Sequence, residues 1–285
     1  HEDYEMAGNL RGVDAIYGGH SDNGLVKPVI HPDTGVIIGL TFGQGMHLGY
    51  TKFIVDTRNH NVSFIDGYLI PVNSNELPKD KLTDKLIGDY RKLYPELSEV
   101  ISTSSKPLMR SYNKESTIGN LLTDYMREVA KSDIAFLNSG AIRSDLYPGN
   151  ITLEKLINVY PFKDNLTTIS LTGMQVKNLI EYSLTLPYGI GQISGLEIKY
   201  DSTLDKMKRL VSIRVNGNEI IDSKEYTVST SGYLSKGGDG YFIFTEGQFV
   251  DDSIPFQDAL YISFKNSKKV EIPALERQID ISKRK

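Results

Sequence analysis

The chain of 285 residues contains no cysteine. This absence excludes disulfide bonds, zinc sites built from thiolates and a cysteine nucleophile. No apolar run approaches the roughly 18 residues that a membrane-spanning helix needs, so we expect no membrane span in this chain. Lysine and arginine form no block, and the net charge is −4 at pH 7. A nucleic acid polymer is therefore not expected as a partner.

Histidine is absent from the chain after position 60. Chemistry that depends on histidine must therefore belong to the N-terminal part, and the later part cannot build a serine–histidine–aspartate triad. A glycine-rich P-loop that ends in Lys-Ser or Lys-Thr is also missing. Metal ligands near the N-terminus and binding groups other than histidine farther along the chain remain as candidates.

Composition divides the chain into three expected parts. Residues 1–75 contain short strand-like pieces separated by glycine and polar turns, which predicts the β-rich end of a domain. Residues 76–99 are expected to be a linker, in which leucine and tyrosine repeat at near-helical spacing over 82–94. Residues 100–285 alternate helical and strand-like patterns, which predicts a mixed domain of the α/β or α+β class.

The segment "VDAIYGGHSDNG", residues 13–24, is the first candidate site. Two glycines allow a strand to turn sharply, because glycine tolerates positive φ. The turn would present the neutral nitrogen of His20 and the hard oxygens of Asp22 to a divalent cation. The same pattern also fits a surface loop in which Asp22 is only a turn former.

The segment "NSGAIR", residues 138–143, is the second candidate and follows the apolar strand "DIAFL". A glycine-containing turn after a strand exposes backbone N–H groups, and the planar guanidinium of Arg143 can hold an anion. An ordinary loop with a solvated arginine is the alternative.

Two later segments, "VYPFKDN" and "TSGYLSKGGDGY", place aromatic rings in loops bounded by proline or rich in glycine. The rings of Phe162 and Tyr233 can stack on a base, which is worth about 1–3 kcal/mol per base. Burial in the core is the alternative. Asp239 lies between glycines and suits either a tight turn or hydrogen bonds from the vicinal hydroxyls of a sugar.

The order of the motifs resembles that of one family. The segments are "GGHSDN", "YLIPVN", "STIGNLLTDYM", "NSGAIR", "VYPFKDN", "SGLEIKYD" and "GGDGY". Together they resemble the exported 5′-nucleotidase family, whose relatives include UDP-sugar hydrolases and 2′,3′-cyclic phosphodiesterases. The resemblance runs across nearly the whole chain, and "NSGAIR" and "GGDGY" are specific to the nucleotide-binding domain of that family.

The resemblance implies an incomplete metallophosphatase domain at 1–75, a connecting helix within 76–99 and a nucleotide-binding domain at 100–285. It implies that the metal ligands of this chain are His1, His20 and Asp22, although relatives commonly carry His, Gln or Asn where this chain has Asp22. The other ligands and the catalytic His–Asp pair would lie N-terminal to this chain. We therefore expect no catalytic residue here and no activity from the chain alone.

For the C-terminal part, the resemblance implies contacts to the phosphate, an aromatic clamp on the base and a carboxylate on the ribose hydroxyls. The implied substrate-binding residues are Asn138, Gly140, Arg143, Phe162, Tyr233 and Asp239.

The function implied for the intact protein is hydrolysis of nucleoside 5′-monophosphates or related nucleotides by two divalent metal ions, such as Zn²⁺ or Mn²⁺. Alternatives in the same family act on 2′,3′-cyclic nucleotides and 3′-nucleotides or on UDP-sugars. An alternative of another class is a nucleoside-binding surface module without catalysis. The implied partner is a small nucleotide, and the implied location is extracytoplasmic, either periplasmic, cell-surface or secreted.

Overall fold

The computed structural model describes residues 2–19, 24–43, 45–73 and 76–284. Contacts divide the chain into two compact units, residues 1–90 and 91–285. The boundary falls inside helix α2 (Lys81–Leu93), within the predicted linker. This helix buries none of its residues, which is consistent with a connecting role, and it confirms the helix predicted over 82–94. It is followed by a 3₁₀ helix, η1 (Pro95–Ser98).

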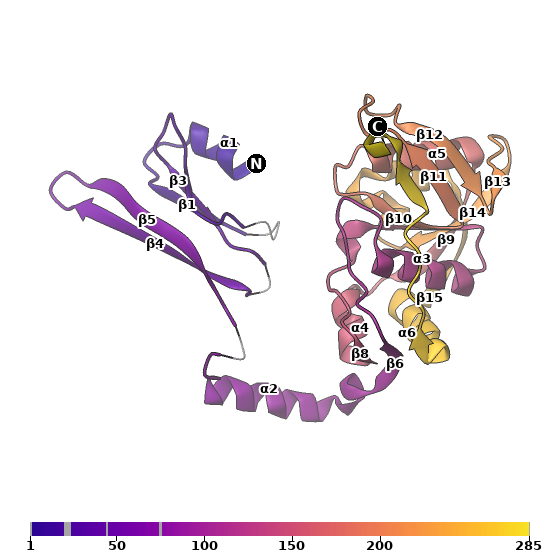
Figure 1. Cartoon of the computed structure of the whole chain (residues 1–285), viewed down its shortest axis with the longest axis horizontal. Coiled ribbons are helices and arrows are strands. Elements are labelled where there is room, and N and C mark those ends of the chain that lie inside the picture. The colour runs from indigo at the N-terminus through magenta and orange to yellow at the C-terminus, as the bar shows by residue number, and fades with distance from the viewer. Residues whose placement is uncertain (1, 20–23, 44, 74–75, 285) are drawn as a thin grey trace. The chain divides into compact units, whose positions relative to one another are not determined.

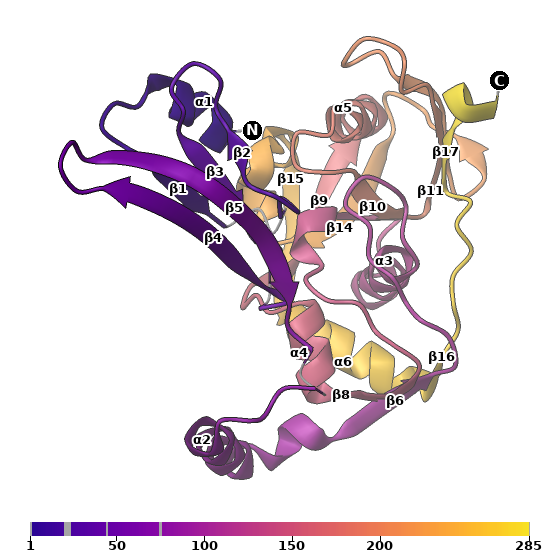
Figure 2. The same cartoon turned by 60° about the vertical axis from the view of Figure 1, so that its left-hand side comes forward.

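The first unit is rich in strands, as predicted. Helix α1 (Glu2–Asn9) packs on a three-stranded sheet of order β1-β3-β2, formed by β1 (Ala15–Gly18), β2 (Val29–Ile30) and β3 (Ile37–Leu40). A long antiparallel hairpin follows, made of β4 (His47–Asp56) and β5 (Asn61–Pro71) (Figure 2). The core of this unit is small and centres on Ala7, Val36 and Ile38.

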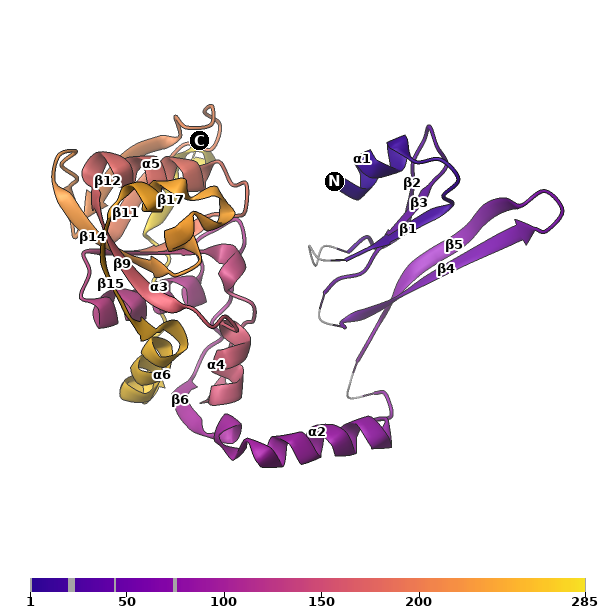
Figure 3. The ribbon, with the colours of Figure 1, turned by 180° about the vertical axis from the view of Figure 1, so that it is seen from behind.

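A five-stranded mixed sheet lies at the centre of the second unit. Its order is β10-β7-β14-β9-β15, and Figure 3 shows β14, β9 and β15 side by side. Only β7 and β14 pair in parallel; the other described pairs of this sheet are antiparallel. The strands are β7 (Ile134–Asn138), β9 (Asn165–Thr172), β10 (Gly191–Ser194), β14 (Glu225–Ser231) and β15 (Gln248–Pro255).

Both faces of this sheet are covered by other elements, and successive side chains of β7 pack alternately into the two cores that result. Ala135 and Leu137 face one core, with helices α3 (Thr117–Ala130), α4 (Leu153–Val159) and α6 (Phe256–Ser267). Ile134 and Phe136 face a second core, with helix α5 (Gly173–Leu184) and the strands β11 (Leu196–Tyr200) and β12 (Leu210–Val215). Figure 1 shows α5, β11 and β12 in the same part of this unit. Successive side chains of a strand point to opposite faces, so a strand buried on both faces is apolar throughout.

Smaller sheets complete the second unit. One has the order β16-β6-β8 and consists of β6 (Val100–Ser104), β8 (Gly149–Thr152) and β16 (Lys269–Val270). The other has the order β13-β12-β11-β17 and consists of β11 (Leu196–Tyr200), β12 (Leu210–Val215), β13 (Asn218–Glu219) and β17 (Gln278–Asp280). Strands β12 and β13 are joined by a tight turn at Asn216 and Gly217, which have φ values of 48° and 80°, and an Asn-Gly pair favours such a turn. The predicted mixed α/β fold class is also confirmed.

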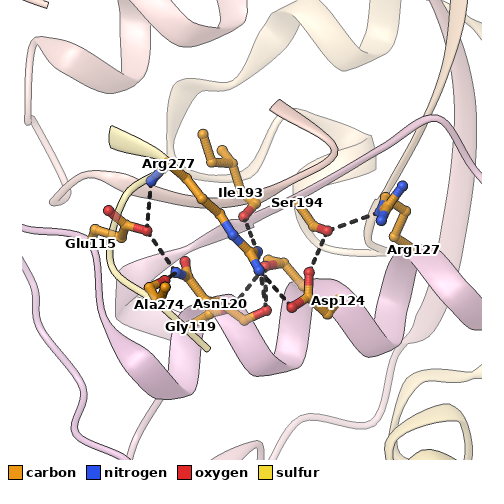
Figure 4. Close-up of polar contacts among 10 residues, drawn as sticks. Glu115, Gly119, Asn120, Asp124, Arg127, Ile193, Ser194, Ala274 and Arg277 are labelled. Carbon is orange, nitrogen blue, oxygen red and sulfur yellow. Dashed lines mark hydrogen bonds and ion pairs between the residues drawn. The ribbon is translucent and has the colours of Figure 1, made fainter. Parts of the chain in front are cut away.

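A polar network ties the C-terminal segment to α3 and β10 (Figure 4). The guanidinium of Arg277 lies 2.6 Å from Asp124 of α3 and donates a hydrogen bond of 2.9 Å to the carbonyl of Ile193. Glu115 accepts hydrogen bonds from the Arg277 N–H at 3.1 Å and from the Asn120 amide at 2.6 Å. Side chains from distant parts of the sequence therefore fix where the last strand of the domain lies.

We predict that Arg277→Ala lowers the free energy of unfolding by about 2–3 kcal/mol, because it leaves Asp124 without its charged partner. Arg91→Ala is the matched control. Its 3.0 Å ion pair with Glu154 is more exposed, so a loss of about 0–1 kcal/mol is expected. Urea unfolding measures both, and losses of equal size would contradict the assignment.

Candidate functional site

The predicted substrate-binding residues lie at or near strand ends along one edge of the five-stranded sheet. Strands β7 and β14 are parallel neighbours, so their C-terminal ends lie at the same edge. Asn138 is the last residue of β7, and Tyr233 follows β14 by two residues. Strand β9 runs antiparallel to β14, with Leu166 opposite Ser231. The loop before β9, which contains Phe162, therefore ends at this edge.

The carboxylate of Asp239 is the point at which these loops meet. One oxygen, Oδ1, accepts a 2.8 Å hydrogen bond from the hydroxyl of Tyr233. The other, Oδ2, accepts a 2.7 Å hydrogen bond from the side-chain amide of Asn138. The hydroxyl of Tyr182 on α5 donates to the Asp239 backbone carbonyl at 3.0 Å. The structure thus brings three of the predicted residues into direct contact.

The backbone around Asp239 requires its glycines. Asp239 has a left-handed φ of 52°, and Gly237 and Gly240 have φ values of 84° and 76°, a region that favours glycine. A Cβ on Gly238 would lie 2.5 Å from the ring of Tyr233, and one on Gly240 would lie 2.2 Å from the hydroxyl of Tyr182. The "GGDG" sequence therefore allows the tyrosine rings to lie directly against the turn.

Phe162 and Arg143 form a second group at the same edge. The guanidinium carbon of Arg143 lies 5.6 Å from the centroid of the Phe162 ring. The ring also meets Tyr160 edge to face, with centroids 5.4 Å apart. Phe162 is 38 % exposed and Tyr233 is 54 % exposed, so neither ring is buried in the core.

Asp164 connects the two groups. Its carboxylate accepts a hydrogen bond of 2.9 Å from the Tyr160 hydroxyl and one of 3.1 Å from the Tyr233 backbone N–H. Burial and the neighbouring Asp164 carboxylate raise the pKa of Tyr160 far above its usual value, so its hydroxyl remains a donor. The loops that carry Phe162 and Tyr233 are therefore held together by one charged group.

Asn138 presents an acceptor that the described residues leave unused. The residue is only 5 % exposed, and its side-chain oxygen has no hydrogen-bond partner among the described residues. A buried polar atom without a partner costs about 1–3 kcal/mol. This oxygen therefore marks a place where a ligand or water would donate a hydrogen bond beside Asp239.

The structure shows no steric role for Gly140 in the candidate site. It lies in the 3₁₀ turn η2 (Ser139–Ala141), and a Cβ there would have ordinary contacts of 3.7 Å to Tyr112 and 3.8 Å to Asn138. No steric reason requires glycine at this position.

Tyr112, Tyr182 and Asp164 are site residues that the sequence did not predict. Burial raises the pKa of the Tyr112 hydroxyl, and the charge of Asp239 raises it further. Burial likewise raises the pKa of Tyr182. The only sequence signal for Asp164 is its position in "VYPFKDN", two residues after Phe162, whereas no local pattern distinguishes the two tyrosines.

A hollow of about 580 Å³ borders these loops on the side of Asp164 and Gly232. It is also lined by Lys163 and Lys236, but not by Phe162, Tyr233 or Asp239. The predicted binding residues therefore lie beside this hollow and not inside it.

The three predicted metal ligands, His1, His20 and Asp22, lie outside the described residues. Within the described ranges, no group of three or more histidine, aspartate and glutamate side chains is placed to hold a metal ion. The described part of the chain therefore does not itself fit a metal centre. The helices in this part are also too short or too polar to cross a membrane.

Comparison with known proteins identifies the second unit. Residues 99–246, just over half of the chain, match the family described as 5′-nucleotidase, C-terminal domain. The chain is 28% identical over 299 residues to the trifunctional nucleotide phosphoesterase protein YfkN of Bacillus subtilis, with 94% of this chain and 20% of that protein aligned. It is 28% identical to the 5′-nucleotidase of Mus musculus, with 99% of this chain and 57% of that protein aligned.

A solved structure has the same fold over nearly the whole chain. The crystal structure of the 5′-nucleotidase precursor from Thermus thermophilus matches with a TM-score of 0.89 at 24% identity, and the match covers 98% of this chain and 61% of that one. The chain thus spans less than two thirds of these relatives. The family match and the fold together show that this chain belongs to the 5′-nucleotidase family, whose C-terminal domain it contains.

Proposed function

We propose that the edge formed by Asn138, Phe162, Tyr233 and Asp239 binds the nucleoside part of a nucleotide. The proposal rests mainly on the Asp239 carboxylate. Each of its oxygens accepts a hydrogen bond, one from Tyr233 and one from Asn138, which fixes its orientation. The side-chain oxygen of Asn138 has no partner among the described residues. Ribose offers vicinal hydroxyls to a carboxylate of this kind. The exposed rings of Phe162 and Tyr233 supply faces on which a base can stack.

Arg143 is proposed as the phosphate contact. Its side chain is exposed and its guanidinium lies over Phe162, so an anion next to the stacked base would be within its reach. The planar fork of arginine can bind two phosphate oxygens together. Asn138, at the end of β7 before the loop that carries Arg143, would contact neighbouring substrate atoms.

For the intact protein, we propose hydrolysis of nucleoside 5′-monophosphates to nucleoside and phosphate. Two divalent metal ions would activate water and neutralise phosphoryl charge, but the described residues do not form their site. This chain would contribute the positioning of the substrate. An extracytoplasmic location is part of the proposal and rests on the family resemblance.

A broader substrate range is the second candidate. It is favoured by the likeness to YfkN, which is called a trifunctional nucleotide phosphoesterase. AMP, 3′-AMP and 2′,3′-cyclic AMP offered separately to the intact protein would distinguish the two. Hydrolysis of AMP alone supports the 5′-nucleotidase assignment, whereas hydrolysis of all three supports the broader range.

Phe162→Ala should weaken adenosine binding by about 1–3 kcal/mol, because it removes one stacking face. Isothermal titration calorimetry of this chain measures the effect. Phe249→Ala is the matched control, since Phe249 is also exposed, on β15, but is not one of the residues that hydrogen-bond to Asp239. If both variants bind adenosine as tightly as the wild type, the stacking role of Phe162 is wrong.

Arg143→Ala should weaken AMP binding by about 1.5–3 kcal/mol and leave adenosine binding nearly unchanged, because only AMP has a phosphate for the guanidinium. Arg214→Ala, which removes an exposed arginine from β12, controls for the change in net charge. An equal loss for AMP and adenosine would rule out a specific phosphate contact.

The chain by itself should show no phosphatase activity on AMP with Zn²⁺ or Mn²⁺ added, because the described residues do not form a metal centre. Release of inorganic phosphate measures this directly. Turnover above the rate in buffer would contradict the expectation.

A further inference from the structure

We infer that the hydroxyl of Tyr233 is a positioning group that couples the base-stacking ring to the sugar-binding carboxylate of Asp239. The inference rests on the proposed function and adds a specific role for one atom of that site. It predicts that the two halves of the nucleoside, base and sugar, are recognised together and not independently.

Two hydrogen bonds join the Tyr233 hydroxyl to Asp239. The Tyr233 hydroxyl donates to Asp239 Oδ1 at 2.8 Å and accepts a hydrogen bond of 3.1 Å from the Asp239 backbone N–H. One hydroxyl thus satisfies both the side chain and the backbone of the same residue. It also holds a backbone whose left-handed φ of 52° is uncommon for a residue other than glycine.

The ring of Tyr233 is fixed by the same contacts. It lies so close to the turn that a Cβ on Gly238 would be 2.5 Å from it. The backbone N–H of Tyr233 donates a hydrogen bond of 3.1 Å to the Asp164 carboxylate. The orientation of the ring and the orientation of the Asp239 carboxylate therefore depend on each other.

The carboxylate has room for a sugar while these contacts persist. An ionised carboxylate accepts about four hydrogen bonds, and its oxygens already accept one from the Tyr233 hydroxyl and one from the Asn138 amide. About two acceptor positions then remain for two vicinal hydroxyls. The sugar does not need to displace the tyrosine, so the hydroxyl assists binding and does not compete with it.

The tyrosine hydroxyl remains protonated in this arrangement. Its hydrogen bond to the Asp239 carboxylate raises the pKa of Tyr233, and partial burial raises it further. The donor that orients the carboxylate is therefore present at neutral pH and well into the alkaline range.

Tyr233→Phe tests the inference because it keeps the ring and removes only the hydroxyl. Calorimetric titration of this chain would compare adenosine with 2′,3′-dideoxyadenosine, which keeps the base but lacks both sugar hydroxyls. We expect the variant to lose about tenfold in adenosine affinity, the size of one hydrogen bond to a charged group. Affinity for the dideoxy compound should change by less than about twofold, because stacking is retained.

Two further variants complete the test. Tyr261→Phe removes a hydroxyl on α6 that donates to Glu99, and it should change neither affinity. In the Asp239→Asn background, Tyr233→Phe should cost much less than it does alone, because the two groups act as a unit. Thermal unfolding of each variant verifies that it is folded.

Three results would overturn the inference: unchanged adenosine affinity, tighter adenosine binding, or an equal loss for both nucleosides. Tighter binding would show that the hydroxyl competes with the sugar. An equal loss would show a general disturbance of the ring. A wild-type chain that binds no adenosine would instead overturn the proposed function, so the two failures are distinguishable.

Discussion

The site depends on the parallel pairing of β7 with β14. Only two residue pairs define this contact, Ile134 with Val228 and Ala135 with Ser229. Because the strands run in the same direction, the loops that follow them emerge at one edge, although about 95 residues separate "NSGAIR" from "GGDGY" in the sequence. The antiparallel strand β9 adds the loop of Phe162 to the same edge. A shift in this register would separate the groups that meet at Asp239.

The side chains at this edge support one another through hydrogen bonds. Asp164 holds the loops of Tyr160 and Tyr233, and Asp239 holds Tyr233 and Asn138. A ligand therefore encounters groups that are already oriented, so it loses less conformational freedom on binding. The rings of Phe162 and Tyr233 are exposed, whereas Asp164 and Asp239 are half-buried.

The sequence predicted the parts of this arrangement that depend on local patterns. The near-helical repeat of leucine and tyrosine indicated the helix over 82–94, and the alternation of helical and strand-like patterns indicated a mixed domain. The order of the motifs indicated the family, which the family match confirms. The ends of elements were less exactly predicted: the helix expected over 82–94 runs from Lys81 to Leu93.

Contacts across long sequence separations could not be predicted in the same way. Tyr182 reaches Asp239 across 57 positions and Tyr233 reaches Asp164 across 69, so both contacts require the sheet register to be known. The unused oxygen of Asn138 likewise becomes visible only when its burial is known.

A crystal structure of this chain with adenosine is the most direct test of the account. We predict electron density for the base against Phe162 and Tyr233, with both ribose hydroxyls within hydrogen-bonding distance of the Asp239 carboxylate. Adenosine bound elsewhere on the domain, or ribose hydroxyls turned away from Asp239, would contradict the assignment of this edge as the nucleoside site.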